Sequence, residues 1–186
     1  MNYKTDFFTD MLTTRPLFLD TETTGLDRRA EVCQIAIVDY DGAVLLDTLV
    51  KPPRRIPPDA TAIHGITNAQ VASAPTFAEI LPQLDDLFYN RNVVIYNADY
   101  DVRLLRQSAR AHGLTFEPRA QFHCAMVAYA QFHGEWDDYR GSYRWVKLGG
   151  ALQNLGIDAT GVALHTALAD AEMTRRLVRA IIGDLK

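Results

Sequence analysis

The chain has 186 residues, of which 48% are hydrophobic and 23% charged, a composition that predicts one compact soluble domain. The sequence has neither an apolar run near the roughly 18 residues of a membrane span nor the basic-then-apolar order of a signal peptide, so we expect a cytoplasmic protein without a membrane partner. Cys33 and Cys124 lie far apart outside any CxxC motif, which predicts two reduced core cysteines and suggests neither a disulfide framework nor a zinc site. A net charge of -4 argues against a broad basic face, but not against an acidic site whose cations reverse its local charge.

Extended segments dominate the first part of the chain. Residues 1–15 are predicted to form a short arm, in which Phe7, Phe8, Met11 and Leu12 could pack as one helical turn. LFLDTET after Pro16 predicts a strand, and EVCQIAIV and AVLLDTLV predict two more over residues 31–38 and 43–50. Asp41-Gly42 between them is a turn signal, so residues 31–50 are predicted to form an antiparallel hairpin.

Helices and strands alternate in the rest of the chain. The segment KPPRRIPPDA is predicted to be a loop because of its prolines. Thr76 and Glu79 form a capping-box pattern for a helix through Phe88, with a kink at Pro82. Residues 92–96 predict a buried strand, and apolar spacing predicts helices over residues 101–112, 121–133, 147–155 and 167–182. We therefore expect an α/β fold with a mixed central sheet flanked by helices, formed by one domain over residues 16–186.

Two carboxylates stand at the end of the first predicted strand. Asp20 and Glu22 are two positions apart, so both side chains lie on one side of an extended chain. Like charges this close raise each other's pKa unless a cation compensates them. The pair could share a metal ion, or could be an ordinary strand end in solvent.

Two further aspartates and a histidine follow near helix starts. Asp101 comes after a buried strand and could be a helix N-cap or a site residue. Asp170 shares an apolar helical stripe with Met173, Leu177 and Ile181, where a carboxylate needs a partner or the help of the helix dipole. His165, five positions earlier, could be a capping or buried histidine, or a catalytic one.

The five residues together predict a hydrolytic metal site. Four carboxylates neutralise two divalent ions, and hard oxygen ligands suit Mg²⁺ or Mn²⁺. Paired ions stabilise the attacking and leaving oxygens of a phosphoryl displacement, and a neutral histidine can take the proton of the attacking water. The expected reaction is phosphodiester hydrolysis.

FLDTETTGL, YNADYDVRLL and HTALADA resemble, in this order, the first, second and third motifs of the DnaQ-like or DEDDh exonucleases, and IPPDATAIHGIT resembles the characteristic loop of this family before its first helix. The resemblance implies an RNase H-like exonuclease fold, two Mg²⁺ or Mn²⁺ ions, and release of nucleoside 5'-monophosphates from a 3' end. By position it implies metal ligands at Asp20, Glu22, Asp101 and Asp170, and a general base at His165. It also implies contacts to the terminal nucleotide from Thr23, Leu26, His64 and Tyr100. Each of these could instead be a core residue, and for Leu26 and Ile63 the two alternatives are about equal. Tyr96 is a departure, because the second motif usually has histidine there.

The expected partner is nucleic acid with a free 3' end, DNA more than RNA and single strands more than duplexes. The alternatives are an exoribonuclease of the same family and a non-catalytic module that binds nucleic acid or a polymerase. The chain ends soon after its last predicted helix, so we expect no polymerase-tethering tail and a stand-alone nuclease of repair, plasmid or phage origin; a homodimer remains open. The loop over residues 134–145 mixes aromatic and basic residues, which suits single-stranded nucleic acid or a loop packed onto the core by its aromatic rings.

Overall fold

The computed structural model describes residues 8, 10, 11, 13–160 and 165–183. A five-stranded sheet with the order β3-β2-β1-β4-β5 forms its centre. β1 (Leu17–Thr23), β2 (Val32–Val38) and β3 (Val44–Leu49) are antiparallel, whereas β4 (Arg91–Ile95) and β5 (Ala120–Cys124) run parallel to β1. The sheet is therefore mixed, as predicted.

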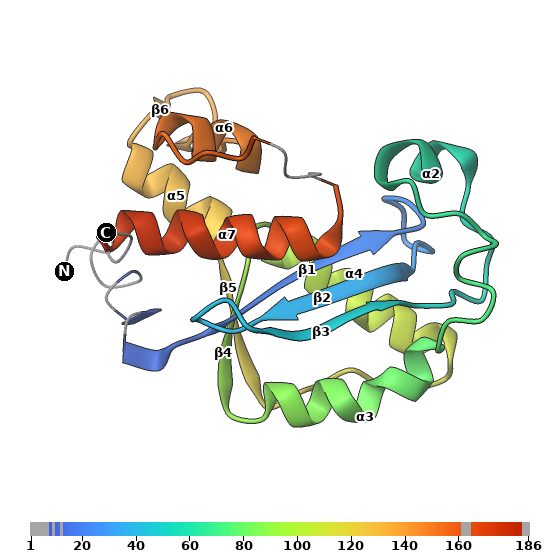
Figure 1. Ribbon diagram of the computed structural model, residues 1–186. Coiled ribbons are helices and arrows are strands. Elements are labelled where there is room, and N and C mark those ends of the chain that lie inside the picture. Colours follow the sequence, from blue (N-terminus) through green and yellow to red (C-terminus); the bar gives the residue numbers. More distant parts are fainter. Residues whose placement is uncertain (1–7, 9, 12, 161–164, 184–186) are drawn as a thin grey trace.

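Helices cover both faces of this sheet (Figure 1). On one face lie α5 (Ala125–His133), α6 (Leu148–Asn154) and α7 (Ala167–Ile181). Their apolar residues form one core cluster with Phe18 of β1 and Val94 of β4. On the other face lie α3 (Phe77–Phe88) and α4 (Ala98–Ala111), which bury Leu19 and Ile95. Alternate residues of β1 thus face opposite helical layers.

Several predicted local signals are confirmed. Thr76 and Glu79 form a complete capping box at the start of α3, with Pro82 inside the helix. The β2–β3 hairpin turns where Asp39 Oδ1 accepts from the backbone N–H groups of Gly42 and Ala43, each at 2.8 Å. In the predicted arm, Phe8 and Met11 are buried in the core of the α7 face, while Phe7 and Leu12 lie outside the described residues.

The predicted helix over residues 121–133 was wrong in its first part. Residues 120–124 form β5, which pairs with β4 along its whole length, and α5 begins only at Ala125. The five residues of β5 are too few for the spacing of their apolar side chains to distinguish a strand from a helix. Phe122 packs in the core with Phe88 and Phe116, and pairing with β4 decides the conformation.

The predicted proline-rich loop contains a short helix, α2 (Pro58–His64). Pro57 is its N-cap and Pro58 its first residue, where the fixed φ of proline suits a helix start and its missing N–H costs nothing. A small hairpin, β6 (Trp136–Asp137) with β7 (Ser142–Tyr143), occupies the predicted aromatic loop. Trp136, Tyr139 and Trp145 are exposed. The alternative prediction, that these rings pack the loop onto the core, was therefore wrong.

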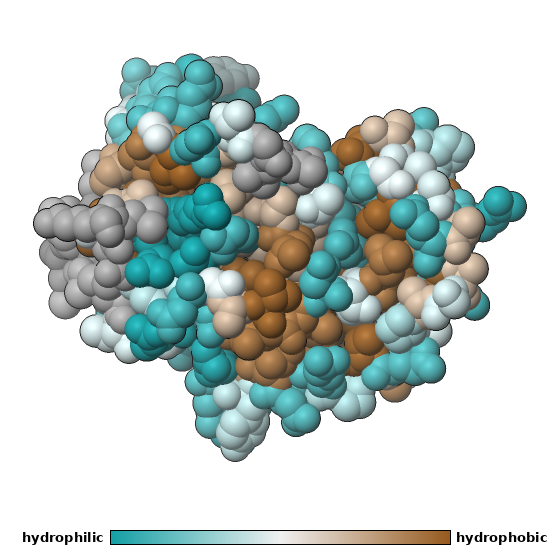
Figure 2. Space-filling model, viewed as in Figure 1, coloured by the Kyte–Doolittle hydropathy of each residue, from teal (hydrophilic) through white to brown (hydrophobic). Residues whose placement is uncertain are grey.

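Exposed apolar side chains also occur on the sheet edge. Hydrophobic residues gather in the middle of the face shown in Figure 2, and the exposed ones on β3 are Val44 and Leu45.

Cys33 is a buried free thiol and Cys124 a half-buried one. None of the described helices combines the length and apolarity that a membrane crossing needs.

Candidate active site

The end of β1 supplies the first two acidic side chains of the site. Asp20 and Glu22 point to the α7 face of the sheet, as Phe18 does two residues earlier. Thr21 and Thr23, between and after them, are buried. The two-residue period of the strand thus places both carboxylates on one side, as predicted.

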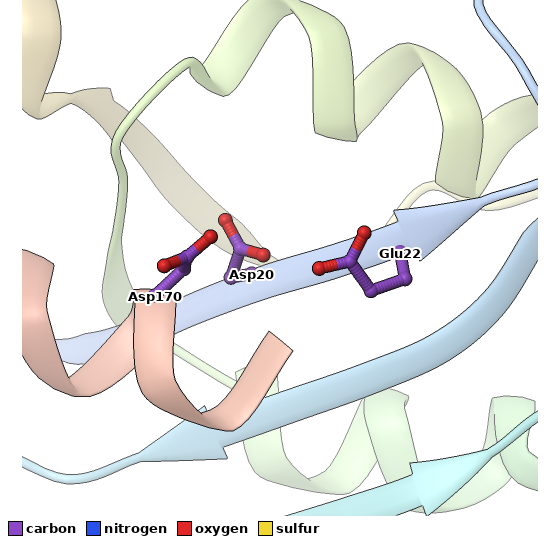
Figure 3. A group of neighbouring side chains, drawn as sticks. All are labelled: Asp20, Glu22 and Asp170. Carbon is purple, nitrogen blue, oxygen red and sulfur yellow. The ribbon is translucent and has the colours of Figure 1, made fainter. Parts of the chain in front are cut away.

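Asp170 joins them from the first turn of α7. Thr166 is the N-cap of this helix, and its hydroxyl accepts from the N–H of Ala169 at 3.3 Å. Carboxylate oxygens of Asp20, Glu22 and Asp170 lie within 4.8 Å of one another, and Figure 3 shows the three groups facing a common space. Residues 150 positions apart in sequence therefore form one acidic cluster.

Asp101 borders the same space from the α4 side. It is 4% exposed, and its Oδ1 accepts a 2.7 Å hydrogen bond from the Thr21 hydroxyl. A cavity of about 200 Å³ is lined by Asp101 together with Asp20, Glu22, Asp170 and His165. Asp101 is not the N-cap of α4, because the helix already begins at Ala98 with Asn97 as its cap residue. The capping alternative is excluded.

Burial raises the pKa of each of the four carboxylates, and repulsion from neighbouring carboxylates adds to the rise for Asp20, Glu22 and Asp101. Burial is the largest cause for Asp20, whose pKa lies well above its usual value, and the charges of Asp101, Asp170 and Glu22 add to it. Burial and the charges of Asp170 and Asp101 raise the pKa of Glu22 to about 7. The pKa values of Asp101 and Asp170 are raised by burial as well, against opposing hydrogen bonds. Such a cluster of hard oxygen donors fits divalent cations, whose charge offsets this repulsion.

His165 lies beside Asp170 in an unusual backbone conformation. Its φ is 73°, a left-handed value that costs a non-glycine residue roughly 1–3 kcal/mol, and strained residues of this kind cluster at functional sites. Its backbone N–H hydrogen-bonds Asp170 and helps to lower the pKa of that carboxyl. The residue is exposed and lines the carboxylate cavity, which excludes the buried alternative. The capping alternative is excluded because Thr166 is the N-cap of α7.

A second hollow adjoins the carboxylates. This nucleotide pocket, as we call it, has a volume of about 610 Å³ and shares Thr21, Glu22, Asn97 and Tyr100 with the smaller cavity. All four residues predicted to contact a terminal nucleotide line it: Thr23, Leu26, His64 and Tyr100. Leu26 is 81% and Ile63 65% exposed, so the core alternative for these two was wrong.

Hydrogen bonds inside the protein fix the polar wall of the nucleotide pocket. The Tyr100 hydroxyl donates to the carbonyl oxygen of Gly25 at 2.9 Å and lies 2.7 Å from Thr23 Oγ1. His64 is buried, its Nδ1 accepts from the N–H of Ile66 at 3.0 Å, and burial lowers the pKa of its ring. The neutral imidazole therefore also stabilises the turn that ends α2.

Sequence reasoning missed Thr21 and Leu148 as parts of the site. Leu148 lines the carboxylate cavity at the start of α6, and no local signal marks it. Tyr96, the departure from the usual second motif, lines the cavity and donates from its hydroxyl to the carbonyl oxygen of Val146 at 2.6 Å. The tyrosine therefore ties the segment before α6 to the end of β4.

Comparison with known proteins identifies the family. A family model described as exonuclease, RNase_T, matches residues 17–178. The chain belongs to this exonuclease family. It is 44% identical over 170 residues to an uncharacterized exonuclease of Escherichia phage 186, covering 89% of this chain and 87% of the phage protein. It is 30% identical to DNA polymerase III subunit epsilon of Pasteurella multocida (strain Pm70), covering 91% of this chain and 69% of that one.

Solved structures agree with this assignment. The exonuclease resembles the structure of Exonuclease X in complex with 5' overhanging duplex DNA, with a TM-score of 0.68, 27% identity and coverage of 91% and 92% of the two chains. The predicted RNase H-like exonuclease fold and the resemblance to DnaQ-like exonucleases are thereby confirmed. The protein is an enzyme, an exonuclease of the DEDDh type that acts on nucleic acid.

Proposed function

We propose that this exonuclease removes nucleoside 5'-monophosphates one at a time from the 3' end of nucleic acid, DNA in preference to RNA and single strands in preference to duplexes. The observation that carries the proposal is the convergence of Asp20, Glu22 and Asp170 within 4.8 Å, beside a pocket of a size that holds one nucleotide. The family match supports one exonuclease domain over residues 16–186. The 3'-to-5' direction rests on the motif resemblance.

Asp20, Glu22, Asp101 and Asp170 would hold two Mg²⁺ or Mn²⁺ ions. When bound, the ions supply positive charge next to the attacking and leaving oxygens of the phosphodiester. Thr21 keeps Asp101 aimed at the cavity through its 2.7 Å hydrogen bond. The acidic side chains thereby fix the place at which the scissile phosphate sits.

His165 is the general base of the proposed reaction. A neutral imidazole accepts the proton of the attacking water as its oxygen forms the new bond to phosphorus and the bond to the 3' oxygen breaks. The leaving oxygen takes up a proton and becomes the new 3' hydroxyl. Exposure of His165 on the cavity rim allows its proton to pass on to solvent.

The nucleotide pocket would hold the 3'-terminal nucleotide. Leu26 and Ile63 offer apolar surface to a base of any identity, which suits sequence-independent removal. DNA preference is supported by the relatives, since Exonuclease X was solved with duplex DNA and the Pasteurella relative is a DNA polymerase subunit.

The test is degradation of matched DNA and RNA oligonucleotides, as single strands and duplexes, labelled at the 5' or the 3' end, with Mg²⁺ and Mn²⁺ compared. A 5'-labelled strand should shorten stepwise, and a 3'-labelled strand should release its label at once as a mononucleotide. Release of the 5' label as a mononucleotide at the start of the reaction, without shortened intermediates, would contradict the direction. Faster loss of RNA than DNA would contradict the preferred substrate.

A further inference from the structure

An arginine-lined hollow lies outside the site described above. It has a volume of about 200 Å³ and is lined by Arg28, Arg29, Arg54, Arg110, Glu31 and Gln107. All four arginines are exposed. In a chain with a net charge of -4, this arginine hollow is a local excess of positive charge, with a single carboxylate among its walls.

The four guanidinium groups have no acidic partner among the residues that the structure describes. None of them takes part in a described salt bridge. Glu31 is 3% exposed, and its Oε2 accepts from the backbone N–H of Arg54 at 3.4 Å. Asp27 likewise accepts from the backbone N–H of Arg29 at 2.7 Å. The nearby carboxylates are therefore engaged by main-chain groups, and the positive charge stays available to a ligand.

The arginine hollow adjoins the nucleotide pocket. Leu26 and Asp27 line the nucleotide pocket, and the next two residues, Arg28 and Arg29, line the arginine hollow. Gln107 of α4 fixes this short segment, because its Nε2 donates to the carbonyl oxygens of Asp27 at 3.2 Å and Ala30 at 2.7 Å. One rigidly held loop thus separates the place for the terminal nucleotide from the arginines.

We propose that the arginine hollow binds backbone phosphates of nucleic acid beyond the nucleotide that is removed. The proposal rests on the proposed function, which places the terminal nucleotide next to Leu26. Guanidinium groups match phosphate oxygens with two parallel N–H donors, and such contacts are independent of base sequence. The phosphates belong either to the strand being cut or to its complement, and both sources share the same chemistry.

The experiment measures binding with the divalent ions chelated by EDTA, so that no strand is cut. The Kd of the full chain for a labelled DNA single strand, and for a duplex with a recessed 3' end, is determined over a range of salt concentrations. The variant is Arg28→Gln with Arg110→Gln. The matched control is Arg91→Gln with Arg119→Gln, which removes two arginines from a different hollow, lined by residues at the starts of β4 and β5.

The Arg28/Arg110 variant should bind more weakly, and the slope of log Kd against log salt should fall by about 1 for each arginine lost. The control pair should keep the slope of the unmodified protein, and Arg28→Lys with Arg110→Lys should largely restore it because the charge returns. Weaker binding of the variant to both substrates would show that the arginine hollow binds phosphates of the cut strand. Weaker binding to the duplex alone would show that it binds phosphates of the complement. Equal slopes for the variant and the control, or no salt dependence in the unmodified protein, would overturn the proposal.

Because nothing is cleaved, these outcomes do not depend on whether the exonuclease reaction proceeds as proposed. Thermal unfolding confirms that each variant is folded.

Discussion

The Thr21 hydroxyl donates a 2.7 Å hydrogen bond to Oδ1 of the buried Asp101. Thr21 stands between Asp20 and Glu22 on β1 but faces the α4 side of the sheet, so it links the strand that carries two acidic residues to the helix that carries a third. This contact partly offsets the rise that burial causes in the pKa of Asp101. It therefore helps Asp101 to stay ionised, as the proposed role of this residue in cation binding requires.

Thr21→Val removes this donor while keeping the shape of the side chain. A lost hydrogen bond to a charged group costs roughly 1.5 kcal/mol or more, so the Mg²⁺ concentration for half-maximal nuclease activity should rise about tenfold. Thr21→Ser keeps the hydroxyl and should behave like the unmodified protein. A valine variant with an unchanged metal requirement would show that the contact does not matter for the site.

The acidic cluster makes the metal-free protein less stable as pH rises. The pKa of Glu22 is raised from 4.5 to about 7, so its ionisation destabilises the folded protein. The loss of stability is absent below pH 4.5, grows between pH 4.5 and about 7, and is constant above this range. Thermal unfolding in EDTA should show Tm falling between these pH values. Glu22→Gln should flatten that fall, whereas Glu117→Gln, at an exposed position, should not. Equal pH profiles for both variants would contradict the raised pKa.

Tyr100→Phe tests the wall of the nucleotide pocket. The change removes the hydroxyl that donates to Gly25 and contacts Thr23, so the segment carrying Leu26 should be held less firmly. We expect KM to rise about fivefold, the equivalent of one ordinary hydrogen bond, with little change in kcat. Tyr139→Phe is the control, because Tyr139 is 98% exposed. A pure loss of kcat in the Tyr100 variant would instead place its hydroxyl in the chemical step.

Leu26→Ala tests the exposed apolar rim. Leu26 is 81% exposed, so its truncation should change the free energy of unfolding by less than about 0.5 kcal/mol. The KM for oligonucleotides should nevertheless rise, because the terminal base loses its contact surface. Val44→Ala, an exposed apolar residue on β3, should leave KM unchanged. If both variants had the same KM, Leu26 would have no part in substrate binding.

Much of this architecture could be predicted because its signals are local. The turn around Asp41-Gly42 and the capping box of Thr76 and Glu79 act within a few residues, and the structure contains both. The acidic residues were recognisable because each stands where burial is expected, and their positions agree with family motifs. Asp20 and Glu22 also needed only the two-residue period of a strand to share one face.

The features that escaped prediction depend on distant partners. β5 is a strand because β4 lies beside it, although its own apolar spacing also suits a helix. Thr21 gains its role only from Asp101, 80 positions later in the chain. Leu148 reaches the cavity only because α6 packs against α7. Contacts between segments that lie far apart in the chain leave no trace in the spacing of apolar residues within each segment.

The most direct test of the acidic site compares Asp101→Asn with Asp99→Asn. Both residues lie in the first turn of α4, but Asp101 is buried at the cavity and Asp99 is exposed. Release of mononucleotides from a single-stranded DNA in Mg²⁺ should be lost in the Asp101 variant and retained in the Asp99 variant, with both proteins folded. Full activity of the Asp101 variant, or equal loss in both, would contradict catalysis by metal ions held between β1, α4 and α7.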